Sequence, residues 1–438
     1  MNNAMRLSFT LLNFFSILFL FVGSQLINAQ SVKVSTFGYQ SANATSALQK
    51  AMESNYDTLV IDRQSADWLI GPLRFYNIKN KVVIFEKGVR LQAKQGYFPQ
   101  KKDGLLSFWY SSNIQFIGNG ATLQMNKEEY VDGEWRHGIS LRSCTDIHIK
   151  DLIICDTGGD GIFLDGKTKD EYSENIFIKN VVLKNNRRQG MTIVSAKNVK
   201  VIGCIFEDTE GTLPGAGVDL EPDHKENRIQ NINFEECVFK NNDHAGIVLA
   251  LHNLDITSSP ISVRFSECLL ENNHNKSNKY IASEITFAAN SASPVQGEVI
   301  IENCIIQNSK WGFFYSRKVS NAYSVLFKDC VARNICLDES YPAMYLEVPN
   351  YYKGNFSLGG FSFENLLVEY ETNVPLLMVR GSHLGTLDEV AKIQGDITVS
   401  STRPKEVEYI NYDPSANVNF NLDIDYQSRL LSDPQHRK

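Results

Sequence analysis

The chain has 438 residues, of which 43% are hydrophobic and 21% are charged, and its formal net charge is −7. These proportions exclude a disordered chain, because there are enough apolar residues to build a packed core. Basic residues are not in excess, which argues against binding through nucleic-acid phosphates, and we expect no nucleic-acid partner.

The first residues have the order of a secretory signal. Arg6 precedes an apolar stretch over residues 11–22, and small residues then lead to Ala29. Positive charge, apolar run and small residues in this order are typical of a signal peptide. A membrane anchor is the alternative, but the run is shorter than the about 20 residues that a span needs. We therefore expect residues 1–29 to be removed, giving a periplasmic or secreted protein with no membrane span after signal removal.

One segment near the mature start predicts a helix. Residues 43–52 are rich in alanine and carry apolar residues at helical spacing. Repetitive folds need a cap on their open ends. We expect this short helix to cap the N-terminal end of the fold.

A short glycine-containing pattern returns through the middle of the chain. Its copies are residues 137–142, 160–165, 189–194, 216–221, 245–250 and 311–316, and their glycines are 23, 29, 27, 29 and 66 residues apart. The last gap fits two turns, with residues 281–285 as the missing strand. In each copy the first and third residues after glycine are large and apolar, which predicts a strand with one buried face.

A second strand precedes most of these copies and ends in a turn marked by Cys and by Asn or Asp. Alignment of these strands stacks five cysteines in one column, namely Cys204, Cys237, Cys268, Cys304 and Cys330. A second column contains Asp156, Asn185, Asp208, Asn241, Asn272, Asn308 and Asn334. We interpret the cysteines as small buried hydrophobic residues rather than disulfides. The amides are expected to hydrogen-bond along the stack at a left-handed bend.

Turns of 23 to 33 residues with short strands and no long helix predict a coiled parallel sheet. The fold class is therefore all-β, a single-stranded parallel β-helix with three faces per turn and the short N-terminal capping helix. We expect this catalytic domain to occupy residues 30–400. The polar segment 401–438 is expected to form an irregular cap or strap over the open end.

Motifs near the start resemble a known superfamily. They are Phe37-Gly38 before the helix, Trp68 to Leu73, Gly88 to Leu91, and Ile117 to Ala121. About residues 31 to 340 resemble the right-handed parallel β-helix carbohydrate-active enzymes, which include pectate lyases and polygalacturonases. The chain has no Gly-His-Gly and no Asp-Asp pair. The resemblance therefore implies the fold and a carbohydrate substrate, and no family residues are carried over.

The repeat register predicts where a functional site lies. Asp219 and Glu221 point outward from one strand, and charged residues cluster on the neighbouring turns. Five residues are predicted to be catalytic: Arg187, Arg188, Asp219, Glu221 and His244. Eight are predicted to bind substrate: Trp135, Arg136, His137, Arg142, Asp160, Asp165, Gln189 and His252.

Two enzyme classes use such residues. In β-elimination at a uronic acid, Arg187 and Arg188 neutralise the carboxylate while His244 or His137 removes the C5 proton. The density of Arg and His favours this class, which means a polysaccharide lyase or a chain-end dehydratase. The alternative is an inverting glycoside hydrolase, with Asp219 paired to Glu221 or Asp165. A non-catalytic glycan-binding solenoid is a third alternative, which predicts an acid-poor groove.

The expected partner is an anionic oligo- or polysaccharide, bound by a monomer. No cofactor or metal is expected. Ca²⁺ held by Asp219, Glu221 and Asp223 is the alternative, since hard oxygen ligands are close together there.

Overall fold

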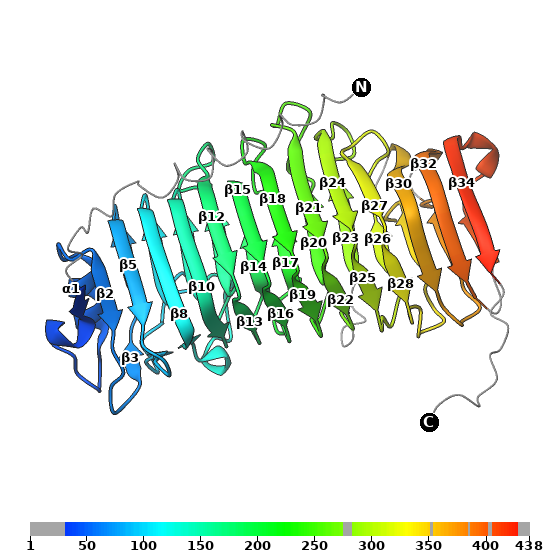
Figure 1. Cartoon of the computed structure of the whole chain (residues 1–438). Helices are drawn as coiled ribbons and strands as arrows, with labels where there is room; N and C mark the ends of the chain where they lie inside the picture. The colour runs from blue at the N-terminus through cyan, green and yellow to red at the C-terminus, as the bar shows by residue number, and fades with distance from the viewer. Residues whose placement is uncertain (1–30, 275–282, 351–353, 384–385, 402–404, 428–438) are drawn as a thin grey trace, which may run out of the picture.

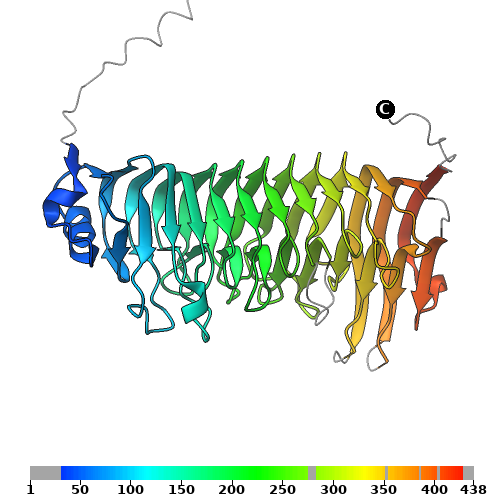
Figure 2. The same ribbon diagram turned by 90° about the horizontal axis from the view of Figure 1, so that it is seen from below.

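A computed structural model describes residues 31–274, 283–350, 354–383, 386–401 and 405–427. The signal peptide predicted over residues 1–29 lies outside the described residues. The strands wind into a long parallel β-helix that runs from the N-terminal helix to the last strand (Figures 1 and 2). In the described part of the chain, no helix is long and apolar enough to cross a membrane.

The strands form two sheets. The 12-stranded sheet contains β4 (Leu73–Tyr76), β7 (Leu106–Trp109), β9 (Ile139–Arg142), β11 (Ile162–Asp165), β14 (Gln189–Ile193), β17 (Ala216–Leu220), β20 (Ile247–Leu251), β23 (Ile285–Ala289), β26 (Phe314–Ser316), β29 (Met344–Glu347), β31 (Pro375–Arg380) and β33 (Lys405–Ile410). The 22-stranded sheet supplies the other two faces of each turn, which confirms the three-faced β-helix.

One face of the 22-stranded sheet contains β1 (Ser31–Lys33), β2 (Thr58–Ile61), β5 (Lys79–Phe85), β8 (Ser112–Gln124), β10 (Thr145–Cys155), β12 (Ser173–Lys179), β15 (Ala196–Ile202), β18 (Ile229–Glu235), β21 (Ile261–Ser266), β24 (Gly297–Glu302), β27 (Ser324–Lys328), β30 (Asn355–Glu369), β32 (Thr386–Ser400) and β34 (Val418–Gln427). The other face contains β3 (Trp68–Ile70), β6 (Arg90–Ala93), β13 (Val182–Lys184), β16 (Ile205–Glu207), β19 (Val238–Lys240), β22 (Leu269–Glu271), β25 (Ile305–Gln307) and β28 (Val331–Arg333). The long strands β8, β10 and β30 continue onto this second face, where they pair with β6, β13 and β28. Helix α1 (Thr45–Met52) and the 3-10 helices η1 (Val34–Phe37), η2 (Lys127–Glu129) and η3 (Pro414–Ala416) complete the chain.

Helix α1 covers the N-terminal end, as its sequence predicts. Its buried residues, Ala47, Leu48, Ala51 and Met52, belong to the same apolar core as the first strands. The helix protects the open backbone edge of the first turn, which would otherwise be available to pair with another chain.

The glycine column lets successive turns approach closely. A Cβ atom added to Gly190 would lie 2.4 Å from the carbonyl oxygen of Gly217 and 2.9 Å from the ring of Phe206. No side chain fits at that distance, so glycine is required by the backbone of the next turn. The residues one and three positions after the glycine, such as Met191 and Ile193, are fully buried.

Stacked amides stabilise the turns. Asn272 donates to the side-chain oxygen of Asn241 at 2.8 Å, and Asn334 donates to Asn308 at 2.6 Å. These residues have φ between 51° and 57°, a left-handed conformation that Asn tolerates better than most residues. The predicted amide ladder at a left-handed bend is therefore confirmed.

The cysteine column lies in the core, as predicted. The five cysteines of the column are at most 2% exposed, and all eight cysteines of the chain are free thiols. Phenylalanines stack beside them from turn to turn: Phe206 and Phe239 have ring centroids 4.8 Å apart, and Phe234 and Phe265 have centroids 4.9 Å apart. These columns follow from the parallel register, which places equivalent residues above one another.

Two sequence predictions about the C-terminal half are wrong. Strand β26 pairs Phe314 with Ile285 of β23, so Phe313 rather than Gly312 occupies the glycine column. The segment 401–438 is not irregular over its described part, because β33 pairs with β31 and β34 pairs with β32 in register. The repeat was hidden there because polar residues fill the outward positions of β34.

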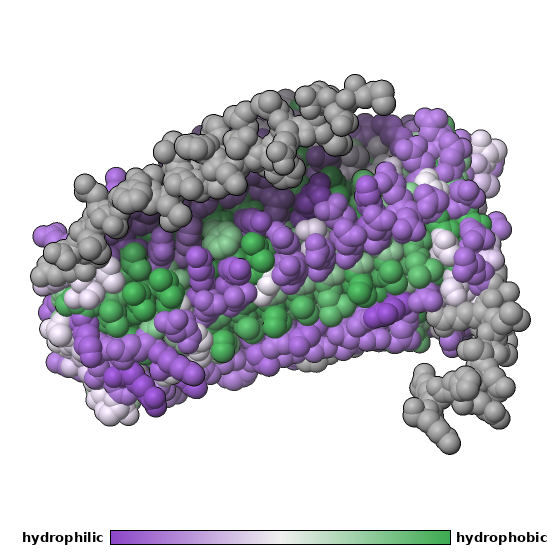
Figure 3. Space-filling view, viewed as in Figure 1, coloured by the Kyte–Doolittle hydropathy of each residue, from purple (hydrophilic) through white to green (hydrophobic). Residues whose placement is uncertain are grey.

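An apolar band runs along the outside of the β-helix. Figure 3 shows it as a continuous green stripe over the strands labelled β13 to β28 in Figure 1. It consists of partly exposed residues that pair in register, namely Ile153 near the end of β10 and the first residues of the following strands, Val182, Ile205, Val238, Leu269, Ile305 and Val331. The next outward row is charged, with Glu207 between Lys184 and Lys240 at 3.1 and 3.0 Å.

Candidate active site

The predicted acidic pair lies on the outer face of the 12-stranded sheet. Asp219 of β17 pairs in register with Thr192 of β14 and with Val248 of β20. Its side chain points away from the core, yet the residue is only 1% exposed. An outward position is therefore compatible with burial here, because neighbouring side chains and loops cover this part of the sheet.

Arg188 joins carboxylates from three turns. Its Nη2 donates to Oε2 of Glu221 at 2.5 Å, its Nε lies 3.3 Å from Glu134, and its Nη1 lies 3.7 Å from Asp160. The same Nη1 is 3.5 Å from the hydroxyl of Thr192. The side chain is 12% exposed, and the surrounding negative charges raise the pKa of the guanidinium despite its desolvation. We name Arg188, Glu134, Asp160, Asp219 and Glu221 the carboxylate cluster.

Asp219 is protonated over an unusually wide pH range. Gln189 donates to Oδ2 of Asp219 at 2.9 Å, whereas Oδ1 of Asp219 is buried without a hydrogen-bond partner among the described residues. Burial raises the pKa of Asp219 well above its ordinary value, and the charge of Glu221 raises it further, while Arg188 opposes this. Asp219 therefore keeps its proton to a higher pH than an ordinary aspartate, because a buried negative charge next to another carboxylate is unfavourable. The exposed fraction of the Glu221 side chain is 32%, so Glu221 is the more accessible partner.

Asp160 and His137 form a buried pair at the edge of the cluster. The backbone N–H of Asp160 donates to Nδ1 of His137 at 3.1 Å, so the imidazole proton lies on Nε2. Burial lowers the pKa of His137 well below its usual value and raises the pKa of Asp160 to about 7. The imidazole also stacks on Phe163, with ring centroids 4.4 Å apart. His137 is therefore a neutral positioning residue for Asp160 rather than an accessible base.

Arg142 and Asp165 lie in the outward row that contains Glu221. Arg142 Nη1 donates to Asp165 at 2.5 Å, and its guanidinium lies 4.5 Å over the ring of Phe163. Asp165 then fixes the loop that follows β11 by accepting from the N–H of Gly166 at 2.7 Å. Burial raises the pKa of Asp165 to about 6, and Arg142 opposes this shift. Arg142 is therefore paired with Asp165, and this ion pair fixes both side chains on the outer face of the 12-stranded sheet.

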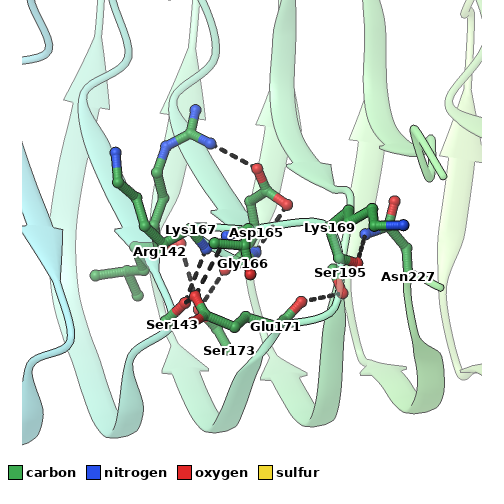
Figure 4. A network of polar contacts seen from close by, with 12 residues as sticks. Arg142, Ser143, Asp165, Gly166, Lys167, Lys169, Glu171, Ser173, Ser195 and Asn227 are labelled. Carbon is green, nitrogen blue, oxygen red and sulfur yellow. Dashed lines mark hydrogen bonds and ion pairs between the residues drawn. The ribbon is translucent and has the colours of Figure 1, made fainter.

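The loop 166–172 is attached to three neighbouring turns (Figure 4). Ser143 accepts from the N–H of Lys167 at 2.8 Å and donates to Glu171 at 2.6 Å. Ser195 donates to the carbonyl of Glu171 at 2.9 Å, and Asn227 donates to that of Lys169 at 3.2 Å. This loop therefore presents its lysines from a fixed backbone.

Two predicted arginines do not reach the cluster. Arg136 is 4% exposed and donates to the carbonyls of Phe98 at 3.0 Å and Asp132 at 2.5 Å, so it fixes loops instead of binding substrate. Arg187 makes no ion pair among the described residues, and its charge acts on Lys127 across the turn. Adjacent residues on a bend diverge, and for that reason Arg188 enters the cluster while Arg187 does not.

The two predicted histidines beyond β17 lie apart from the cluster. His244 occupies the column of Arg188 two turns on, since its N–H donates to Gly215, the next column member after Arg188. Its ring is 5.5 Å from that of His274, and burial lowers the pKa of His244 to about 4. His252 is exposed after the end of β20 and contributes only its carbonyl to a bond from Asn290.

Three residues of the site were missed by sequence reasoning. Glu134 comes from the loop before β9, Thr192 of β14 contacts Arg188, and Phe163 of β11 is a large residue between Ser140 and Thr192 in its outward row. The large outward Phe163 was the available signal. Trp135, predicted to bind substrate, is 40% exposed beside Glu134, with the ammonium of Lys102 5.5 Å from its ring centroid.

The described residues contain no group of three or more His, Cys, Asp or Glu placed to hold a metal ion. Asp219 and Glu221, two members of the alternative Ca²⁺ site, instead form hydrogen bonds with Gln189 and Arg188, respectively.

A pocket of about 850 Å³ lies elsewhere, against η2, and is lined by residues such as Lys94, Lys127 and Asp156. The carboxylate cluster takes no part in it.

Comparison with known proteins defines the class of fold. A family model for the right-handed β-helix region matches residues 112–292. The catalytic unit of a thermostable GH87 α-1,3-glucanase from Streptomyces thermodiastaticus strain HF3-3 has a TM-score of 0.57 at 11% identity, covering 91% of this chain and 69% of that one. The protein is therefore a right-handed parallel β-helix.

Two further proteins are similar over parts of their length. The uncharacterised protein YclG of Bacillus subtilis (strain 168) is 27% identical over 221 residues, which cover 46% of this chain and 35% of YclG. The match thus spans about a third of that relative. The Family 28 exopolygalacturonase of Yersinia enterocolitica has a TM-score of 0.45 at 11% identity, covering 91% of this chain and 79% of that one.

Proposed function

We propose that the protein hydrolyses glycosidic bonds in an oligo- or polysaccharide bound along the outer face of the 12-stranded sheet. The observation that carries this proposal is the placement of two carboxyls in different environments: Asp219 is buried, with a raised pKa, and Glu221 two residues later is more exposed and bonded to the guanidinium of Arg188. Hydrolysis of a glycosidic bond needs one protonated and one ionised carboxyl group. The fold likeness to an α-1,3-glucanase supports the choice of a glycan substrate.

The two carboxyls have different roles in this proposal. Asp219 donates its proton to the glycosidic oxygen, so the leaving sugar departs as a neutral alcohol. Glu221, more exposed and bonded to Arg188, accepts a proton from the attacking water. Gln189 fixes the Asp219 side chain through its 2.9 Å bond, and Gln189 is itself fixed because its Oε1 accepts from the N–H of Ala216 at 2.7 Å.

The contacts that Arg188 makes argue against the alternative reaction, β-elimination. β-Elimination at a uronate needs a cation that is free to bind the substrate carboxylate. Arg188 already contacts Glu134, Asp160 and Glu221, and the charge of Arg187 acts on Lys127 rather than at this cluster. The role that the sequence predicts for this arginine pair therefore loses its support, and elimination becomes an outcome of the test.

The site of action is part of the same proposal. We propose export, with loss of residues 1–29, because a polymeric glycan does not enter the cell. The protein is proposed to act as a monomer, in which one chain supplies every residue of the carboxylate cluster.

A glycan panel tests the reaction class. The full mature chain is incubated with neutral and uronate-containing oligosaccharides, and new reducing ends are counted against ultraviolet absorbance from an unsaturated uronate. Hydrolysis predicts reducing ends without that absorbance. Equal growth of both signals would establish a lyase and overturn the proposal, and binding without products would indicate a glycan-binding solenoid. Asp219→Asn is the control for a contaminating activity.

A further inference from the structure

An aromatic stack continues the outward row of Glu221 toward the N-terminal end. The register places Tyr76, Trp109, Arg142 and Asp165 in one row on consecutive turns, from β4 to β11. The rings of Tyr76 and Trp109 are parallel, with centroids 4.7 Å apart and an interplanar angle of 10°. Tyr76 is 54% exposed, so a large aromatic surface is open to solvent on the row that also contains Glu221 of the carboxylate cluster.

A lysine lies beside this stack without a charged partner. Lys167 Nζ is 6.0 Å from the ring centroid of Trp109, and no carboxylate of the described residues lies within ion-pair distance of it. The other charges nearby are engaged: Arg142 pairs with Asp165, and Glu171 accepts from Ser143 and from the N–H of Thr168. Lys167 is thus the cation that remains available to a ligand at this place.

The stack is too far from the cluster for a single sugar to reach both. Four strand steps separate Trp109 on β7 from Glu221 after β17, which at about 4.8 Å a step is roughly 19 Å. The intervening row contains Arg142, Asp165 and Val194, whose side chains are mostly buried, so a ligand that reaches both places has to lie over this row. A ligand that spans this distance is an extended oligosaccharide.

We propose that Tyr76, Trp109 and Lys167 form a distal subsite for an acidic sugar of the chain that is cleaved at Asp219 and Glu221. The exposed ring of Tyr76 contacts the apolar face of a sugar, and Lys167 binds its anionic substituent. This subsite rests on the proposed function. It adds the class of substrate, which is an acidic oligosaccharide longer than a disaccharide.

Calorimetric titration of the full mature chain tests the subsite. Asp219→Asn is used as the parent to prevent turnover, with short and long oligogalacturonates and with neutral oligogalactosides as ligands. Affinity of the parent should rise with chain length and be higher for the acidic series. Adding Tyr76→Ala should weaken binding of long ligands about tenfold. Adding Lys167→Gln should reduce the affinity for acidic ligands to that for neutral ones.

Tyr97→Ala and Lys94→Gln are the matched controls. Tyr97 is 43% exposed with Lys94 Nζ 4.2 Å from its ring centroid, but it lies in the loop after β6, outside the Glu221 row. Neither change should alter affinity. Unchanged affinity in Tyr76→Ala and Lys167→Gln, or no binding of long acidic ligands by the parent, would overturn the subsite even if the protein cleaves glycans. Weakened binding in a protein that cleaves no glycan would retain the subsite and remove the hydrolysis.

Discussion

Nη2 of Arg188 donates to Oε2 of Glu221 at 2.5 Å, while the same guanidinium lies 3.7 Å from Asp160 two turns earlier. Arg188, just before β14, therefore joins Asp160, just before β11, to Glu221, just after β17. Among the carboxylates that Arg188 contacts, Asp160 is fully buried, so loss of the Arg188 guanidinium leaves the Asp160 carboxyl with little access to water. This makes Arg188 a positioning residue for the proposed acid and base.

Arg188→Met should destabilise the protein by about 3 kcal/mol, because it leaves buried carboxylates unpaired. Adding Glu221→Gln should restore part of that stability, since one of the unpaired charges is removed. Urea unfolding of the single and double variants gives the coupling. Lys184→Met removes the half-exposed Lys184 ammonium from Glu207 and Asp208, but Glu207 keeps its pair with Lys240, so the change should cost at most about 1 kcal/mol. Equal losses in Arg188→Met and Lys184→Met would contradict this account.

Asp219→Asn should reduce kcat by about 10²–10⁴-fold, because the proposed acid loses its proton. Its melting temperature should be unchanged or higher, since a buried carboxyl is replaced by a neutral group. The raised pKa of Asp219 gives a pH test: wild-type activity should persist above the ordinary carboxyl range and fall as pH rises through that pKa. Full activity in Asp219→Asn on the true substrate would exclude this residue as the acid.

Glu284 provides a test of pH-dependent stability away from the site. It replaces glycine in the column and accepts from the N–H and the side chain of Asn273 at 3.0 and 2.6 Å. Burial raises its pKa to about 7, so folding favours the protonated form. Stability should fall as pH rises from about 4.3, the usual value for Glu in unfolded chains, to about 7, and stay lower above it.

Glu284→Gln removes that titration. The stability difference between variant and wild type should therefore shift in favour of the variant between about pH 4 and pH 7. Melting temperatures measured across this range give the difference, and comparison at each pH cancels the titration of other groups. A difference that does not change with pH would show that Glu284 titrates as it does in the unfolded chain.

Gly190→Ala should destabilise the fold by about 1–3 kcal/mol, since its Cβ would meet the carbonyl of Gly217 at 2.4 Å. Gly71→Ala is the matched control, because its nearest contact is the exposed ring of Tyr97 at 3.3 Å. The control should differ from wild type by less than about 1 kcal/mol. Comparable melting temperatures for the two variants would show that the glycine column does not set the spacing of turns.

The sequence predicts the fold well because a parallel β-helix repeats its constraints. Stacked residues such as Cys237 and Asn241 recur at one position of each turn, so their environment can be inferred from alignment alone. The last turns escaped this reasoning because residues 405–427 contain neither the glycine nor the cysteine by which the earlier turns were aligned. The displaced copy at Gly312 shows that glycine can also fall one residue before its column.

The site was predicted in part. The outward parity of Asp219 and Glu221 and their proximity to Arg188 follow from strand register. The direction of a side chain at a bend does not follow from it, and this separates Arg187 and Arg136 from the cluster. Loop residues such as Glu134 also cannot be placed from register, since loop geometry sets their position.

Cleavage in water enriched in heavy oxygen tests the central claim most directly. The mature chain is given a substrate identified by the glycan panel, and the products are quenched early and weighed by mass spectrometry. Hydrolysis at Asp219 and Glu221 predicts one heavy oxygen at each new reducing end, and parallel reactions with Asp219→Asn should yield about 10²–10⁴-fold less labelled product in the same time. Unlabelled reducing ends paired with unsaturated uronates would contradict the account, because elimination leaves the glycosidic oxygen on the departing sugar.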